Sequence, residues 1–297
     1  MELQDKYINL LTDFGFKRIF GTEENKDLLK HFINLSLPAK HQVKSLKFSD
    51  KERIGEKLEE RKAIFDIYCT AINGEKIIVE LQKTKQEYFK DRSIFYSSDT
   101  IRSQAPQGIW NFNLTPVYTI SILDFVFESE KENPKYLHKI QLRNEEGIVF
   151  YDKLHYIYIE LPKFGKKLNE LETEFDKWLF IVKALHTLVD RPKMLDEPIF
   201  DKIFRSAEIA NYSKMERIQY KESLKIHRDM VNSLDYAKKE GKAEGKAEGK
   251  AEGKAEGIDL TLKVIKLLKE GVPVSDISSK LEIEEAEVLK IKSQMNL

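Results

Sequence analysis

The chain has almost no cysteine and no excess of charge of either sign. Cys69 is the only cysteine among 297 residues, so no disulfide can form within the chain, as is typical of proteins from a reducing compartment. Lysine plus arginine and aspartate plus glutamate each total 50, so the formal net charge is zero. The net charge therefore does not indicate nucleic-acid binding, and any contact with DNA has to come from a local positive patch.

Long apolar runs are absent too. No stretch approaches the roughly 20 apolar residues of a membrane span. The first residues, MELQDKYINL, lack the basic and apolar regions of a signal peptide. We therefore expect a soluble, cytoplasmic protein without a membrane partner. Charge of both signs is abundant instead, because charged residues make up 34% of the chain and crowd into its C-terminal third.

The most informative stretch is residues 63–82, AIFDIYCTAINGEKIIVELQ, in which two β-rich runs flank an Asn-Gly pair. Such a pair between two runs is a strong hairpin signal. The first run carries Asp66, and the second carries Glu80 and Gln82. Because side chains alternate along a strand, Glu80 and Gln82 point to the same face. Converging carboxylates repel each other unless a proton or a cation lies between them. A divalent metal with oxygen ligands would satisfy both.

The length of the turn decides whether the two carboxylates meet. A two-residue loop of Asn73 and Gly74 would place Asp66 opposite Leu81, on the wrong side from Glu80. We therefore predict that the loop holds three residues or that a bulge intervenes. The alternative interpretation is that both carboxylates are charges on an exposed face of the sheet.

The runs around this hairpin predict a mixed α/β fold. A helical stripe ends at Pro38, a strand follows over residues 42–49, and residues 83–104 have helical spacing after the hairpin. Residues 114–127 form the most buried-looking strand. A helix between two strands normally makes them a parallel pair with a right-handed crossover. Two runs within residues 136–161 are expected to extend the sheet, and the charged residues 50–62 to form a loop or ribbon.

These motifs resemble the PD-(D/E)XK nuclease core, with Gln82 at the position that usually holds lysine. The order of elements is the αβββαβ order of that core, a restriction-endonuclease-like α/β fold with a mixed sheet. The stretches that carry the resemblance are LTDFGFKRIFG, FDIYC, IIVELQ and YFKDRSIFYSSDTIRSQ. In this order they are similar to the recombination-promoting nuclease and transposase family within the superfamily.

The resemblance implies a Mg²⁺-dependent DNA endonuclease linked to recombination or mobile elements, with Mn²⁺ as an alternative cofactor. It implies that Asp66, Glu80 and the backbone carbonyl of Leu81 hold the metal, and that Gln82 orients a water or a phosphate oxygen. The six histidines show no ligand spacing, so none is expected to bind metal. The alternative function is a catalytically inactive relative that binds DNA or protein through its helical C-terminus.

Four residues outside the hairpin are further candidates. Asp13 and Lys17 belong to a stretch that lies beside the active site in the resembled family, although Asp13 is equally suited to cap a helix. Arg92 and Tyr96 lie one turn apart on the predicted helix and would meet the scissile phosphate. The alternative is an arginine paired with Glu80 or Asp99 and a tyrosine in the core.

The remainder of the chain is predicted to be helical. We assign a nuclease-like domain to residues 1–165, a helical extension to 166–239, a KAEG-repeat linker to 240–257 and a small helical domain to 258–297. In the repeat, like charges recur every four residues and five glycines each cost roughly 1 kcal/mol against alanine, so an isolated helix is marginal. The repeat is either a semi-flexible spacer or a Gly/Ala seam that lets two helices approach in a dimer.

Residues 258–297 have the pattern of a helix-turn-helix unit. If this unit read DNA, its second helix would present Glu284, Glu285 and Glu287 at its start, and phosphates repel these carboxylates. The segment also has more apolar positions than about 40 residues hide well: Leu260, Val264, Leu267, Ile277, Leu281, Val288 and Ile291. We therefore predict that it forms a homodimer, with direct DNA binding as the alternative.

Overall fold

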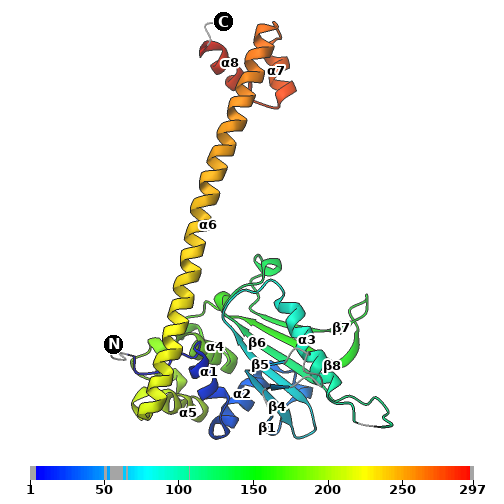
Figure 1. Cartoon of the computed structure of the whole chain (residues 1–297), viewed down its shortest axis with the longest axis vertical. Coiled ribbons are helices and arrows are strands. Elements are labelled where there is room, and N and C mark those ends of the chain that lie inside the picture. The colour runs from blue at the N-terminus through cyan, green and yellow to red at the C-terminus, as the bar shows by residue number, and fades with distance from the viewer. Residues whose placement is uncertain (1–4, 50–51, 54–62, 65, 107, 295–297) are drawn as a thin grey trace. The chain divides into compact units, whose positions relative to one another are not determined.

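The computed structural model describes the chain except residues 1–4, 50–51, 54–62, 65, 107 and 295–297 (Figure 1). Most of the predicted charged loop therefore lies outside the described residues. The contacts between residues divide the chain into two units, Met1–His227 and Arg228–Leu297. The helix α6 (Lys214–Lys269) begins in the first unit and ends in the second. Each unit has its own hydrophobic core.

The first unit is built on a six-stranded mixed sheet with the strand order β1-β4-β5-β6-β8-β7. Strands β5, β6 and β8 are parallel to one another, whereas β1, β4 and β7 each run antiparallel to a neighbour. The strands are β1 (Leu46–Phe48), β4 (Ile67–Ala71), β5 (Lys76–Gln82), β6 (Val117–Leu123), β7 (Leu137–Arg143) and β8 (Val149–Glu160). A separate ribbon pairs β2 (Glu52–Arg53) with β3 (Ala63–Ile64).

The central strands explain the hydrophobic pattern of the sequence. All seven residues of β6 are buried, because the strand has neighbours on both edges and is covered on both faces. The helix α3 (Phe89–Arg102) connects β5 to β6, which confirms the predicted parallel crossover. Strands β7 and β8 extend the sheet, as predicted, and the edge strand β7 leaves Ile140 and Leu142 partly exposed.

Helices cover both faces of the sheet. One face carries α1 (Asp13–Phe20), α2 (Lys26–Ser36), α4 (Glu174–Ala184) and α5 (Pro198–Ala207), whose buried side chains share one core with alternate residues of β5, β6 and β8. On the other face the side chains of α3 pack on Tyr68, Ile78, Tyr156 and Tyr158. The sheet is therefore the middle layer of the unit.

The main core continues across residue 165, where the sequence suggests a domain boundary. Trp178 of α4 is fully buried, and its ring lies 5.5 Å from the ring of Phe20 in α1. Near the N-terminus, the backbone N–H of Asn9 donates to the hydroxyl of Tyr220 in α6 at 2.9 Å. Leu224 is also part of this core. The helical extension and the sheet therefore form one folded body as far as the first turns of α6.

Several helix boundaries differ from the sequence-based expectation. Thr12, not Asp13, caps α1, because its hydroxyl accepts the backbone N–H of Gly15. Helix α3 begins at Phe89 rather than near residue 83. In the predicted helical extension, single 3₁₀ turns at residues 168–170 and 185–187 lie on either side of α4. The short 3₁₀ helices are η1 (Glu23–Asn25), η2 (Ala39–His41), η3 (Glu128–Glu130), η4 (Leu161–Lys163), η5 (Leu168–Glu170), η6 (Leu185–Thr187), η7 (Lys193–Leu195) and η8 (Ile209–Asn211).

The second unit contains the later part of α6 followed by α7 (Val274–Leu281) and α8 (Glu285–Gln294). Its core is built around the buried side chains of Val264, Ile277 and Val288. Between α7 and α8 the backbone turns at Glu282, whose φ is +55°, which confirms the turn expected between two helices here.

The KAEG repeat is helical and belongs to α6. Every residue from 241 to 257 is exposed, and a Cβ built on any glycine of the repeat meets no other atom within 4 Å. Nothing in the described part of the chain therefore packs against the repeat. No described helix is long and apolar enough to cross a membrane.

Candidate active site

The hairpin between β4 and β5 has a three-residue loop, as predicted. The backbone N–H of Ala71 donates to the carbonyl of Glu75, and Gly74 closes the loop with an N–H donated to Ala71, both at 2.9 Å. Gly74 has a φ of +93°, a conformation that side chains with a Cβ rarely adopt. The Asn-Gly pair therefore specifies a turn, and one additional residue, Ile72, shifts the register.

This register brings the two carboxylates together. Ile67 pairs with Val79, so Asp66 at the start of the hairpin lies opposite Glu80. Asp66 Oδ2 accepts the backbone N–H of Leu81 at 2.8 Å. In an extended strand the N–H and C=O of one residue point to the same edge, so the Leu81 carbonyl also faces the Asp66 side. Both carboxylates and this carbonyl thus lie at the same end of β5.

Glu80 is the most perturbed acid of the site. It is only 5% exposed, and within the described part of the chain its Oε2 has no hydrogen-bond partner. Burial raises the pKa of Glu80 to about 7, against the opposing charge of Arg92 and with a contribution from Asp66. Burial also raises the pKa of Asp66, although the Leu81 N–H and Lys17 act in the opposite direction. A cation placed between these carboxylates would offset both effects, so the residues fit a metal site.

Gln82 and Arg92 form a polar pair beside Glu80. The Gln82 side chain accepts a hydrogen bond from Arg92 Nη2 at 2.5 Å and donates from Nε2 to the backbone carbonyl of Thr84 at 3.1 Å. Arg92 Nη1 donates to the side chain of Gln86. The guanidinium of Arg92 is therefore held at the open end of the site by two neutral amides.

Tyr96 lies one turn further along α3. The centre of its ring is 5.8 Å from the Arg92 guanidinium, and it packs against the buried side chains of Tyr68 and Ile78. Asp99 forms an ion pair with Arg102 at 3.4 Å, not with Arg92. Tyr96 is thus partly a core residue, and its contact with Arg92 links that core to the site.

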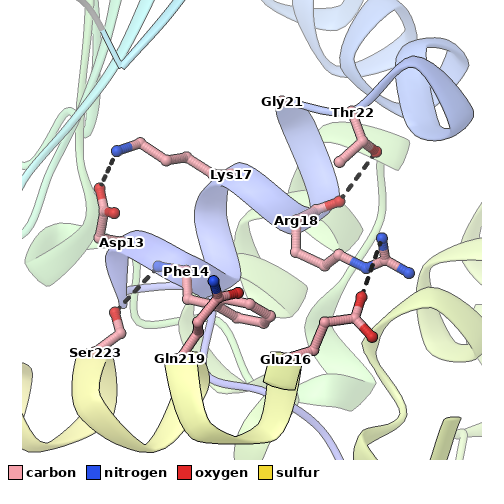
Figure 2. Close-up of a pocket in the computed structure, with 9 residues that line it drawn as sticks. All are labelled: Asp13, Phe14, Lys17, Arg18, Gly21, Thr22, Glu216, Gln219 and Ser223. Carbon is pink, nitrogen blue, oxygen red and sulfur yellow. Dashed lines mark hydrogen bonds and ion pairs between the residues drawn. The ribbon is translucent and has the colours of Figure 1, made fainter. Parts of the chain in front are cut away.

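Asp13 and Lys17 form an ion pair of 2.7 Å on α1. Their charges reach the site, because Lys17 lowers and Asp13 raises the pKa of Asp66. Figure 2 shows the two side chains on α1 facing each other at the rim of a pocket of about 470 Å³, which is also lined by the first turns of α6. Within this pocket the N–H of Phe14 donates to Ser223 Oγ at 3.1 Å, which fixes the start of α1.

The sequence-based site did not include Lys83 or Asp124. Lys83 is half-buried, and burial lowers the pKa of its ammonium, whereas Asp13, Asp66 and Asp124 raise it. Burial likewise raises the pKa of Asp124. Alternation along β5 assigns Lys83 to the face away from Glu80, yet the strand ends at Gln82. The signal that was available is that this lysine directly follows Gln82.

The order of the sheet, the crossover helix and the paired acids at the end of β5 define a nuclease fold of the PD-(D/E)XK class. The family model of PD-(D/E)XK nuclease family transposases matches residues 10–237, and the chain belongs to this family. The match covers every candidate site residue, so the family suggested by the sequence motifs is confirmed. No curated protein and no solved structure is significantly similar to the chain.

The raised pKa of Glu80 predicts how stability depends on pH. Folding raises this pKa from 4.5 to about 7, so Glu80 contributes stability that is fully present below pH 4.5 and is lost as the pH rises through 7. The loss amounts to about 3 kcal/mol at most. Thermal unfolding in metal-free buffer between pH 4.5 and 8 measures it. Glu80→Gln should flatten this part of the curve, and Glu145→Gln, at an exposed position, should leave it unchanged.

Proposed function

We propose that the protein is a Mg²⁺-dependent endonuclease that hydrolyses phosphodiester bonds in DNA. The observation that carries the proposal is the convergence of Asp66 and Glu80 at one end of β5. The buried Oε2 atom of Glu80 has no hydrogen-bond partner among the described residues. The family match supports a nuclease linked to mobile elements. Beyond the family, we propose that the protein uses Mg²⁺, that it cuts DNA and that it acts in recombination.

Asp66, Glu80 and the Leu81 carbonyl are the groups that would hold the metal. All three offer oxygen atoms, which Mg²⁺ prefers and to which Mn²⁺ also binds. Bound there, the ion would lower the pKa of a coordinated water and stabilise the charge that develops on the phosphate. Among the described residues only the Leu81 N–H donates to Asp66, at Oδ2, so the other oxygen of this carboxylate could bind the ion.

Arg92 and Gln82 are suited to bind the phosphate. The acceptors of the Arg92 guanidinium are two neutral amides, and a phosphate makes hydrogen bonds to arginine that are roughly twice as strong. A phosphate at this position would therefore displace the amides and release Gln82 to orient a water or a phosphate oxygen. Lys83 is near enough to Asp66 for their charges to interact, and it offers the positive charge that the superfamily usually draws from the position of Gln82.

A groove next to Arg92 supports DNA as the substrate. It has a volume of about 470 Å³ and is lined by residues of α3 and the segment before it. Tyr88 and Phe95 expose 67% and 53% of their surface there. Exposed rings beside an arginine are the elements with which proteins stack bases and contact the backbone of a nucleic acid.

The first test is cleavage of supercoiled plasmid with Mg²⁺, with Ca²⁺ and with EDTA. We expect Mg²⁺-dependent nicking or cutting by the wild-type protein and a loss of at least about 100-fold in Asp66→Asn and Glu80→Gln, because each removes a metal ligand. Thermal stability should stay level or rise, because the repulsion between the carboxylates is removed. A folded variant that cuts at the wild-type rate contradicts the assignment. Mg²⁺-independent DNA binding without cleavage by the wild-type protein supports the inactive relative.

The second test separates Gln82 from Lys83. Gln82→Lys should retain measurable cleavage, because lysine has a similar reach, whereas Gln82→Leu should lose much more. Lys83→Met should reduce cleavage and leave the melting temperature unchanged, with the exposed Lys85→Met as the matched control. Equal rates for all four variants would remove both residues from the chemistry.

We further propose that the protein forms a homodimer through its C-terminal helices. The core of the second unit already buries Val264, Ile277 and Val288, three of the apolar residues from which the sequence predicts a homodimer. Other apolar side chains remain exposed there: Ile258, Leu262 and Leu289 expose between 52% and 59% of their surface. Two nuclease units in one assembly would suit the cutting of both DNA strands.

The dimer is tested by light scattering of the full-length protein. The wild-type chain should have the mass of a dimer at micromolar concentration. The double variant Leu262→Glu, Leu289→Glu should be monomeric, because the charges would be buried at the interface. Lys263→Glu and Lys290→Glu change charge at neighbouring exposed positions and serve as controls. A wild-type monomer, or a double variant that stays dimeric, overturns the proposal.

A further inference from the structure

A second group of metal-ligating side chains lies apart from the nuclease site. His41 belongs to η2, and Asp152 and His155 belong to β8. One nitrogen or oxygen from each residue lies within 4.8 Å of the other two. The sequence spacing of the histidines does not reveal this group, because the fold brings together segments that are more than a hundred residues apart.

This group is on the opposite face of the sheet from Glu80. His155 pairs with Tyr118 on β6, and Tyr118 pairs with Ile77 on β5. Ile77 precedes Glu80 by three residues, so the two side chains point to opposite faces. A ligand of the histidines would therefore not contact Asp66 or Glu80.

The distances suit a shared metal better than they suit direct hydrogen bonds. His41 Nε2 lies 3.4 Å from Asp152 Oδ2, and His155 Nε2 lies 3.6 Å from Asp152 Oδ1. Hydrogen bonds of this kind are normally no longer than about 3.2 Å. Ligand atoms at about 2.0–2.2 Å from one tetrahedral zinc are roughly 3.3–3.5 Å apart. Only small side-chain adjustments are needed to place the three donors around one ion.

The surroundings of the two imidazoles also suit metal binding. His41 Nε2 is buried and forms no hydrogen bond among the described residues, so its lone pair or proton is unused. His155 is 3% exposed, so the fold encloses its imidazole. The ring of Tyr118 stacks on His155 with 4.8 Å between the ring centres and fixes its orientation.

A second layer of contacts surrounds the group. His155 Nε2 lies 3.2 Å from the backbone carbonyl of Asp152, and Gln141 Nε2 lies 3.2 Å from His155 Nδ1 and donates to Asp152 Oδ1 at 3.1 Å. A metal at Nε2 would replace the contact with the carbonyl, and half a turn of the Gln141 amide, which gives up its bond to Asp152, would present an oxygen to the Nδ1–H. Lys40 contacts Asp152 Oδ2 at 2.5 Å. The Lys40 side chain is 63% exposed, so it can move into solvent when a cation takes the oxygen.

We propose that His41, Asp152 and His155 bind a divalent transition metal of the zinc type, which would clamp η2 to β8. Two imidazoles and a carboxylate suit Zn²⁺ and related ions, whereas Mg²⁺ prefers oxygen donors alone. The three residues leave a fourth position for water. The site is separate from the carboxylates of the nuclease site, because it lies on the other face of the sheet.

In the test, the full-length protein is first treated with a chelator and then titrated with Zn²⁺, and calorimetry measures the binding. It is performed in an Asp66→Asn, Glu80→Gln background, so that the proposed Mg²⁺ site does not contribute. We expect one equivalent of Zn²⁺ to bind, unaffected by millimolar Mg²⁺, and Co²⁺ to give the visible absorption of a tetrahedral site. His41→Gln, which removes the ligand contributed by η2, should weaken binding by at least about 100-fold.

Two further variants sharpen the result. Lys40→Met should tighten Zn²⁺ binding, because it removes a positive charge that competes for Asp152. His186→Gln changes a histidine outside the group and should leave the affinity unchanged. Absence of Zn²⁺ binding by the background protein overturns the proposal, and so does wild-type affinity in both His41→Gln and Asp152→Asn. Neither result bears on DNA cleavage, which is measured separately with the Asp66 and Glu80 variants.

Discussion

The acceptance of the Leu81 N–H by Asp66 is the interaction on which the rest of the site depends. It exists only because the hairpin loop has three residues, which places Asp66 opposite Glu80 rather than opposite Leu81. The two carboxylates share this end of β5, and burial there raises the pKa of Glu80 to about 7. A cation bound between the carboxylates, as proposed above, would offset the free-energy cost of that burial.

Much of this arrangement follows from local rules of sequence. Strand alternation, the Asn-Gly pair and the apolar run of β6 predict the hairpin and the parallel crossover, because each depends on neighbouring residues. The three-residue loop is one of two alternatives, the other being a bulge, and both follow from the requirement that Asp66 and Glu80 meet. The position of Lys83 does not follow, since alternation holds only inside a strand and β5 ends one residue earlier. Thr12 rather than Asp13 caps α1 because both residue types suit a cap and the choice depends on one residue of register.

The group of His41, Asp152 and His155 marks a different limit of prediction from sequence. Its members contact one another only through the pairing of β8 with β6 and the position of η2, which are properties of the whole fold. The same applies to the partners of Arg92, which are amides of β5 and of the segment before α3 rather than the carboxylate one or two turns away. Tertiary contacts therefore decide which polar side chains are brought together, while the sequence decides which are available.

The hydrogen bond between Asn9 and Tyr220 has a consequence for how the protein is made. It joins residues at opposite ends of the first unit, and the parallel strands β5, β6 and β8 likewise pair only across long stretches of chain. Contacts of such high sequence separation form slowly and only after the later partner exists. During synthesis the main core of the nuclease unit can therefore be completed only when the first turns of α6 have emerged, so an interrupted chain would leave the ribosome without that completed core.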